Sequence, residues 1–138
     1  MKSLSVKVGV ILAIGLVVLG YAEVWGADWK PYSRDDEEIR YYDAEGMVRP
    51  SENTVKVWLN WEYTDKGVMG MVKELGKKYK NISYTMALGE ISCLDKKIQT
   101  LSLIRNTKEG YIISTSSHTG TWQYFVPGSL LYEALCSK

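Results

Sequence analysis

The sequence is poor in the residues on which most active sites depend. Its 138 residues include a single histidine, His118, and only two cysteines, Cys93 and Cys136. A structural zinc site needs four ligands, so one imidazole and two distant thiols argue against a site of that kind. The motifs G-x-x-x-x-G-K, H-E-x-x-H, G-x-S-x-G and C-x-x-C-H are also absent. The sequence therefore gives no support for nucleotide, metalloprotease, serine hydrolase or c-type haem chemistry, and we expect no cofactor and no metal.

The sequence also has no marked excess of basic or of acidic residues. The chain carries 17 Lys and Arg against 16 Asp and Glu, and without Lys2, Lys7 and Glu23 it carries 15 of each. A nearly neutral domain generates no broad field that would attract nucleic acid or an anionic membrane. What the sequence does contain is ten Tyr and five Trp against one Phe. Such aromatic residues are typical of half-exposed sheet faces.

Residues 1–26 have the pattern of a secretory signal peptide. Lys2 and Lys7 precede an uncharged run over 8–22, and small residues follow it. A membrane-spanning helix needs about 20 apolar residues, and this run is shorter and contains three glycines, which favours cleavage over a retained anchor. Cleavage after Gly26 or after Ala22 fits equally well, and cleavage after Ala27 fits less well. We expect an exported domain over 27–138, in the periplasm, at the cell surface or outside the cell, with no membrane span after cleavage.

The two cysteines of that domain predict one disulfide. Outside the reducing cytosol, a lone pair of thiols normally becomes oxidised. A Cys93–Cys136 bridge would close a long loop, which the chain-entropy model values at about 4 kcal/mol. The two residues are too far apart for a C-x-x-C redox pair. We therefore expect the bridge to be structural.

Alternating and helical patterns predict a sheet with two helices. In residues 54–64, Val55, Val57, Leu59, Trp61 and Tyr63 share one face, which is typical of a half-buried strand. Further strands are expected over 39–43, 82–94, 97–106, 111–117 and 122–126, joined by short turns that favour an antiparallel meander. Residues 49–53 are expected to form a turn-rich connection. Ser129 is a plausible N-cap for a terminal helix over 130–136, with Leu131, Ala134 and Leu135 facing the core.

The mid-chain helix and the best strand supply the candidate binding residues. Val68, Met71, Val72, Leu75 and Tyr79 lie on one stripe and predict an amphipathic helix of about three turns. Its glycines, Gly70 and Gly76, lower helix propensity by about 1 kcal/mol each, so packing on the sheet must hold it. Lys73, Lys77 and Lys78 fall outside the stripe and form either a ligand-binding face or simply a solvated one. Trp58 is the one aromatic residue on the polar face of the strand over 54–64.

Two other features are interpreted as non-functional. His118 lies in a turn rich in Ser, Thr and Gly, which is a common setting for a polar loop residue. The acidic run over 35–38 could offer hard oxygen ligands to a divalent cation, but it lacks the spaced pattern of a calcium loop. We expect a solvated acidic turn there and no catalytic role for His118.

The order of several short motifs resembles the surface-adhesin protein E family. Trp29, the Tyr-Tyr-Asp of 41–43, the Val-Lys-Val-Trp of 55–58, the strand after Cys93, Gly110, Trp122, the Pro-Gly-Ser of 127–129 and Cys136 recur in the family's order. The resemblance spans 29–136 and implies a small exported bacterial domain with an antiparallel sheet and a helix packed on it. For founding members it implies adhesion to host extracellular proteins, and dimerisation. The lipid-accepting Cys is missing here, and Gly46-Met47 stands where the family usually has Ser-Ile.

These observations predict an α+β domain whose antiparallel sheet has about five or six strands. It carries one mid-chain helix and a short C-terminal helix pinned by the disulfide. The predicted function is non-catalytic binding of a protein or extracellular-matrix-type ligand, with a homodimer as a further expectation and no nucleic acid partner. The alternative is a periplasmic or extracellular accessory protein that supports assembly of an envelope or filament complex, by docking through a sheet edge or an aromatic surface.

Overall fold

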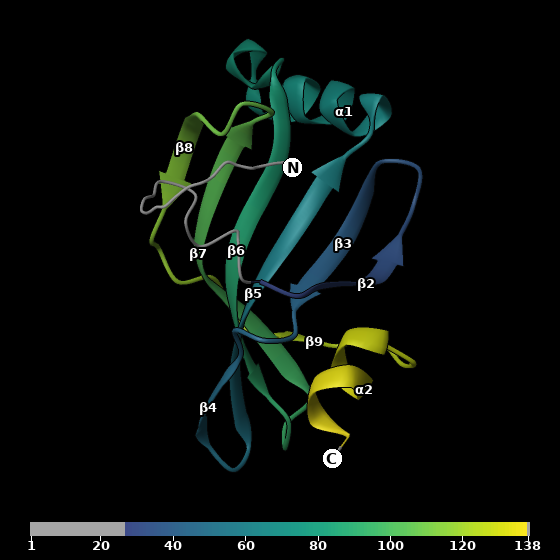
Figure 1. Cartoon of the computed structure of the whole chain (residues 1–138), viewed down its shortest axis with the longest axis vertical. Coiled ribbons are helices and arrows are strands. Elements are labelled where there is room, and N and C mark those ends of the chain that lie inside the picture. The colour runs from purple at the N-terminus through teal and green to yellow at the C-terminus, as the bar shows by residue number, and fades with distance from the viewer. Residues whose placement is uncertain (1–26, 138) are drawn as a thin grey trace.

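The computed structural model describes residues 27–137, and the predicted signal peptide lies outside these residues. The described chain forms an antiparallel sheet with one helix near each end of its long axis (Figure 1). Its elements are β2 (Trp29–Arg34), β3 (Glu38–Asp43), β4 (Val48–Ser51), β5 (Thr54–Tyr63), α1 (Asp65–Leu75), the 3-10 turn η1 (Lys77–Tyr79), β6 (Ile82–Ser92), β7 (Lys97–Thr107), β8 (Ile112–Ser116), β9 (Gln123–Tyr124) and α2 (Leu130–Cys136).

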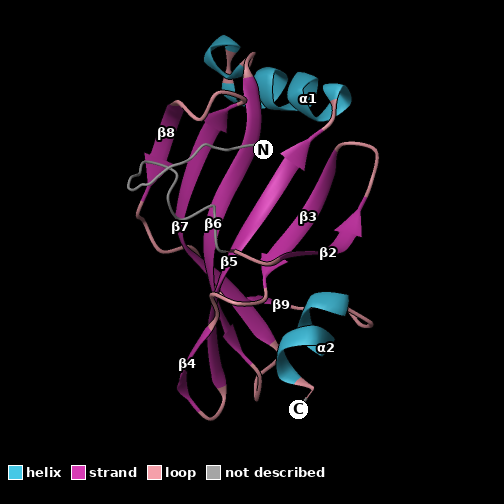
Figure 2. Cartoon of the chain, viewed as in Figure 1, coloured by secondary structure: helices cyan, strands magenta, loops and turns pink. Residues whose placement is uncertain are grey.

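The order β2-β3-β5-β6-β7-β8 forms the main path of the sheet, and β4 and β9 are added beside it (Figure 2). The outer edge of β5 is divided, because β3 pairs with residues 59–63 and β4 with residues 54–56. The outer edge of β7 is divided in the same way between β8 and β9. Three long strands therefore run the length of the domain, and short strands flank them at either end.

The core lies on one face of the sheet, as the alternation in β5 predicts. Val55 and Val57 are fully buried and Leu59 nearly so. Their register partners on β6, Ile91, Gly89 and Ala87, complete this face. Leu131 and Leu135 of α2 pack against it. Ala134, expected to face the core, is exposed instead, because the short helix turns only Leu131 and Leu135 inward.

The predicted disulfide is confirmed. Cys93 and Cys136 are bonded, with their Cα atoms 5.6 Å apart. The Tyr132 hydroxyl donates to the Cys93 carbonyl at 2.8 Å, and the Arg49 guanidinium donates to the Leu135 carbonyl at 2.7 Å. Ser129 caps α2 through its hydroxyl, which accepts from the Tyr132 amide. Leucine packing, hydrogen bonds and the covalent bond thus all hold this helix to the sheet.

The mid-chain helix has the predicted length of about three turns but differs from its prediction in position and packing. It begins at Asp65, after the Thr64 N-cap, and ends at Leu75. Gly76 has φ of 114°, a conformation that L side chains rarely adopt, so the chain leaves the helix there and Tyr79 falls in η1. Leu75, expected on the buried stripe, is 43 % exposed. Within α1 only Gly67 is buried.

The sequence analysis missed two strands, β2 and β4. Both contain a proline, Pro31 in β2 and Pro50 in β4, and proline removes a ladder donor. Both also sit at edges of the sheet, where such a residue is tolerated. The segment over 49–53 is accordingly a strand and a tight turn into β5, rather than a connection without strand structure.

Gly46 and Met47 each have a clear structural role. Asp43 is buried, and its carboxylate accepts from the Asp28 and Glu45 amides. A Cβ atom at position 46 would lie 2.3 Å from Asp43 Oδ2, so a larger residue would force this buried carboxylate to shift. Met47 packs against the core cluster.

Candidate binding surfaces

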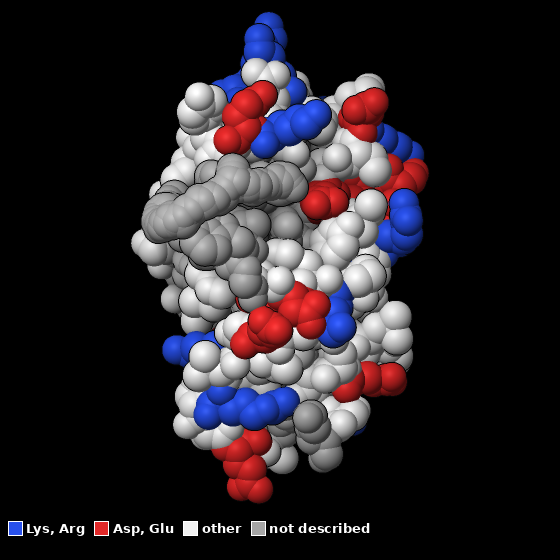
Figure 3. All heavy atoms as spheres, viewed as in Figure 1, with Lys and Arg blue, Asp and Glu red and all other residues white. Residues whose placement is uncertain are grey.

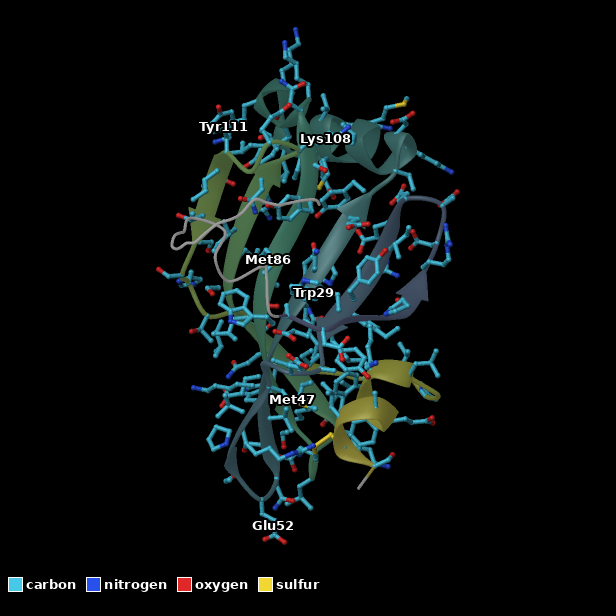
Figure 4. The ribbon with its side chains drawn as sticks, viewed as in Figure 1. Trp29, Met47, Glu52, Met86, Lys108 and Tyr111 are labelled. Atoms are coloured by element: carbon cyan, nitrogen blue, oxygen red, sulfur yellow. A yellow bond between two sulfur atoms is a disulfide. The ribbon has the colours of Figure 1, made fainter. Side chains whose placement is uncertain are left out.

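Trp58 lies on the sheet face opposite the core. It occupies the middle of β5 and pairs in register with Leu88 of β6, while the next position on that face, Asn60, pairs with Met86. Met86 in turn pairs with Ile104 of β7. Side chains paired in this way lie close enough to contact each other. We call these five half-buried residues the Trp58 face: Trp58, Asn60, Met86, Leu88 and Ile104. Figure 4 places Met86 in the middle of the long axis.

Asn60 gives this face an unsatisfied polar atom. Its Oδ1 is buried and accepts no hydrogen bond from any described residue. A buried acceptor left without a donor costs about 1–3 kcal/mol.

The three candidate lysines lie elsewhere. Lys73 is in α1, and Lys77 and Lys78 are in η1, beyond the end of β5, whereas Trp58 is in mid-strand (Figure 1). All three side chains are exposed. The Lys78 ammonium lies 5.4 Å from the centre of the Tyr79 ring. The kink at Gly76 separates Lys73 from the other two, so the lysines do not form one continuous helical face.

A pocket lies where α1 meets the β2–β3 turn. Its volume is about 540 Å³. Its walls come from the start of β3, the end of β5 and the exposed part of α1, and they consist of Glu37, Glu38, Tyr63, Gly67, Gly70, Met71, Lys73 and Glu74. Among these residues, the sequence analysis proposed only Lys73 as a binding residue. It interpreted the acidic run over 35–38, which contains Glu37 and Glu38, as a solvated turn, because no local pattern reveals that this turn meets α1.

Polar contacts fix the position of this pocket. The Thr64 hydroxyl donates to the Asp36 carbonyl at 2.7 Å, and the Thr64 amide donates to the Glu37 carbonyl at 2.9 Å. A Cβ atom at position 67 would lie 2.0 Å from the same Glu37 oxygen, so glycine is required there. The β2–β3 turn therefore rests directly on the first turn of α1.

The carboxylates of this corner fall into two groups. Arg40 bonds Asp35 at 2.8 Å and Glu38 at 2.7 Å, and Lys66 bonds Asp36. The hydrogen bond from Arg40, together with the amides of Glu37 and Glu38, lowers the pKa of Asp35 to about 2. Glu37 and Glu74, by contrast, form no ion pair with any described residue. Figure 3 shows basic and acidic side chains interspersed on the visible face, without a dominant sign.

Tyr63 forms an aromatic wall of the pocket. Its hydroxyl and the Thr85 hydroxyl are 2.7 Å apart, and burial raises the pKa of Tyr63. The phenol therefore stays neutral at physiological pH and is held in one orientation. Tyr63 and Trp58 project from opposite faces of β5, because their positions differ by five, an odd number, and successive side chains of a strand alternate between its faces. The pocket and the Trp58 face are thus distinct surfaces.

The remaining candidates are not part of either surface. His118 is exposed in the loop after β8, and its amide donates to the Ser116 hydroxyl. Within residues 27–137, no group of three or more His, Cys, Asp or Glu side chains is placed to hold a metal ion. None of the described helices has the length and apolar character needed to cross a membrane.

Comparison with known proteins gives one match. The model of a protein family described as surface-adhesin protein E matches residues 29–137, nearly the whole described chain. Searches of curated proteins and of solved structures found no significant match.

Proposed function

The chain belongs to the surface-adhesin protein E family, and from this premise we propose that it is an exported, non-catalytic protein that binds a protein ligand of extracellular-matrix type. The family match supports an adhesin-like surface protein. Residues 1–26 act as a cleaved leader in this proposal, and a mature N-terminus between Glu23 and Asp28, measured by mass spectrometry of the exported protein, tests that part.

The Trp58 face is the surface we propose for ligand contact, and the observation that carries this is Trp58 itself, a half-buried aromatic side chain on the sheet face opposite the core. An aromatic side chain flanked by Met86 and Leu88 supplies apolar contact area, and tryptophan is enriched among residues that dominate binding energy. Lys73, Lys77 and Lys78 would add charge at the neighbouring end of the sheet.

The experiment compares two tryptophan variants against a panel of purified extracellular matrix proteins, with binding measured by biolayer interferometry. Trp58→Ala should weaken binding by about 2 kcal/mol or more, if Trp58 is a central contact. Trp122→Ala is the matched control, because it removes the same side chain from a loop outside the Trp58 face. Equal affinities for the two variants would contradict the assignment of this face.

The non-catalytic part of the proposal has its own test. His118→Ala should leave ligand affinity and the melting temperature nearly unchanged, because this side chain lies exposed in a loop. A hydrolytic or redox activity of the purified protein that disappeared in His118→Ala would overturn it.

A further inference from the structure

The pocket beneath α1 differs in chemistry from the Trp58 face. Three of its lining residues are glutamates and one is a lysine, so its formal charge is negative. The Tyr63 ring and the Met71 thioether add apolar surface to the same walls. A concave site with acidic groups and an apolar wall is complementary to a cation carried on an apolar stem, because long basic side chains bury their methylene groups and keep their charge at a polar end.

The free carboxylates strengthen this assignment. In the same corner, Asp35 and Glu38 share the Arg40 guanidinium, and Asp36 pairs with Lys66. Glu37 and Glu74, which line the pocket, form no ion pair with any described residue, although the Lys66 charge also acts on Glu37. Two carboxylates that line the cavity are thus left without a paired basic side chain.

Gly70 supplies a second, steric argument. Glycine in a helix interior costs about 1 kcal/mol relative to alanine. At Gly67 that cost has a structural cause, since the Glu37 carbonyl leaves no room for a Cβ atom. At Gly70 a Cβ atom would meet only Glu37 Oε2, at an ordinary contact distance of 3.8 Å. Packing therefore does not require glycine at position 70. The absence of a side chain there leaves the cavity unfilled.

We propose that this pocket binds an alkylammonium or guanidinium group on an apolar stem, such as a lysine or arginine side chain of the protein ligand. The cation would lie between Glu37 and Glu74, and its stem would lie along Tyr63 and Met71. The inference rests on the proposed function in one respect only, namely that the source of this group is a protein. The pocket would give the protein ligand a second contact, on the opposite side of β5 from Trp58.

The test is a titration followed by NMR, with the amides of Gly67 and Gly70 as reporters. The probes are a blocked Gly-Lys-Gly peptide, its arginine and norleucine analogues, and n-pentylamine. The lysine or arginine peptide should shift both reporters and saturate, and the neutral norleucine peptide should not. Binding of n-pentylamine without binding of either basic peptide would overturn a protein source, and saturable binding of norleucine would overturn cation recognition.

Variants of the pocket sharpen the result. Glu37→Gln and Glu74→Gln should each weaken binding of the basic peptide about threefold, as expected for partly solvated ion pairs. Glu109→Gln is the control, because it removes the same charge from an exposed turn between β7 and β8 and should leave affinity unchanged. Equal losses in all three variants would show a non-specific charge effect and overturn the site.

A steric pair of variants tests the cavity itself. Gly70→Leu should fill the pocket and abolish binding of the basic peptide, while Gly70→Ala should keep most of it. Melting curves of both variants show whether the fold is intact. Unchanged peptide affinity in a folded Gly70→Leu protein would refute the proposal. That outcome would leave the Trp58 face untouched, because matrix-protein binding that depends on Trp58 is measured independently.

Discussion

The two ends of the sheet are built on different physical principles. At the α2 end, the disulfide joins a helix to the sheet, and Leu135 lies among fully buried aliphatic side chains such as Val55 and Ile91. At the α1 end, the helix buries only Gly67, and polar contacts from Thr64 and Arg40 hold the β2–β3 turn. The first end is held by aliphatic packing and a covalent bond, whereas the second end keeps an open pocket. The difference shows how a small domain can hold a loosely packed helix on a firmly packed base.

The largest expected effect comes from removing the covalent bond at the α2 end. A protein with both Cys93→Ala and Cys136→Ala should lose about 4 kcal/mol of unfolding free energy, because the unfolded chain regains the freedom of a long loop. Chemical denaturation monitored by circular dichroism measures the loss. Glycine reporters at positions 67 and 70 should keep their chemical shifts under native conditions. Changes confined to the α1 end would contradict the division between the two ends.

The α1 end has its own matched pair of substitutions, with a smaller expected effect. Gly67→Ala should destabilise the protein by about 1–3 kcal/mol, as overpacking does, because its Cβ atom would collide with the Glu37 carbonyl. Gly70→Ala should instead stabilise it by about 1 kcal/mol or less, because helix propensity improves without a clash. Thermal melting of both variants decides this. Effects of the same sign would show that the turn does not rest on the helix as described.

The smallest expected effect is the pH dependence supplied by Asp35. Its pKa is about 2 in the folded protein against an ordinary value of 3.8, so its stabilising contribution is complete above pH 3.8 and declines as the pH falls towards 2. Asp35→Asn should therefore lose less stability than the wild type over this acid interval and be slightly less stable at neutral pH. Denaturant midpoints measured across the interval test the prediction. If the denaturant midpoints of the two proteins fell in parallel with pH, the acid sensitivity would come from groups other than Asp35.

The sequence was informative wherever one chain segment decides its own structure. Alternation in residues 54–64 predicted β5 and its buried face, and Ser129 with the two leucines predicted α2. The cysteine pair was predictable because export leaves few alternatives for two thiols. Prolines at positions 31 and 50 obscured β2 and β4, because their compatibility with a strand depends on an edge position that only the whole sheet defines. The end of the mid-chain helix was misplaced. The helical spacing of apolar residues continues to Tyr79, whereas the helical backbone ends at Gly76.

The candidate surfaces were predictable to a smaller extent. Trp58 stands out as an aromatic residue on a polar face, so the strand pattern alone identifies it. The pocket could not be found in this way, since Glu37, Tyr63 and Gly70 meet only through the packing of a turn on a helix. The orphan oxygen of Asn60 likewise depends on what surrounds it in three dimensions.

The divided outer edges of β5 and β7 have a consequence for how this protein behaves when crowded at high concentration. Exposed strand edges are templates for uncontrolled sheet growth between molecules, and long flat edges are the most hazardous. Here the flanking strands are short, the longest of them having six residues, and β2 and β4 each contain a proline that breaks the row of donors. Fibre-like stacking of copies is thereby discouraged at the described edges, so the molecule can present an apolar aromatic face without polymerising through its backbone.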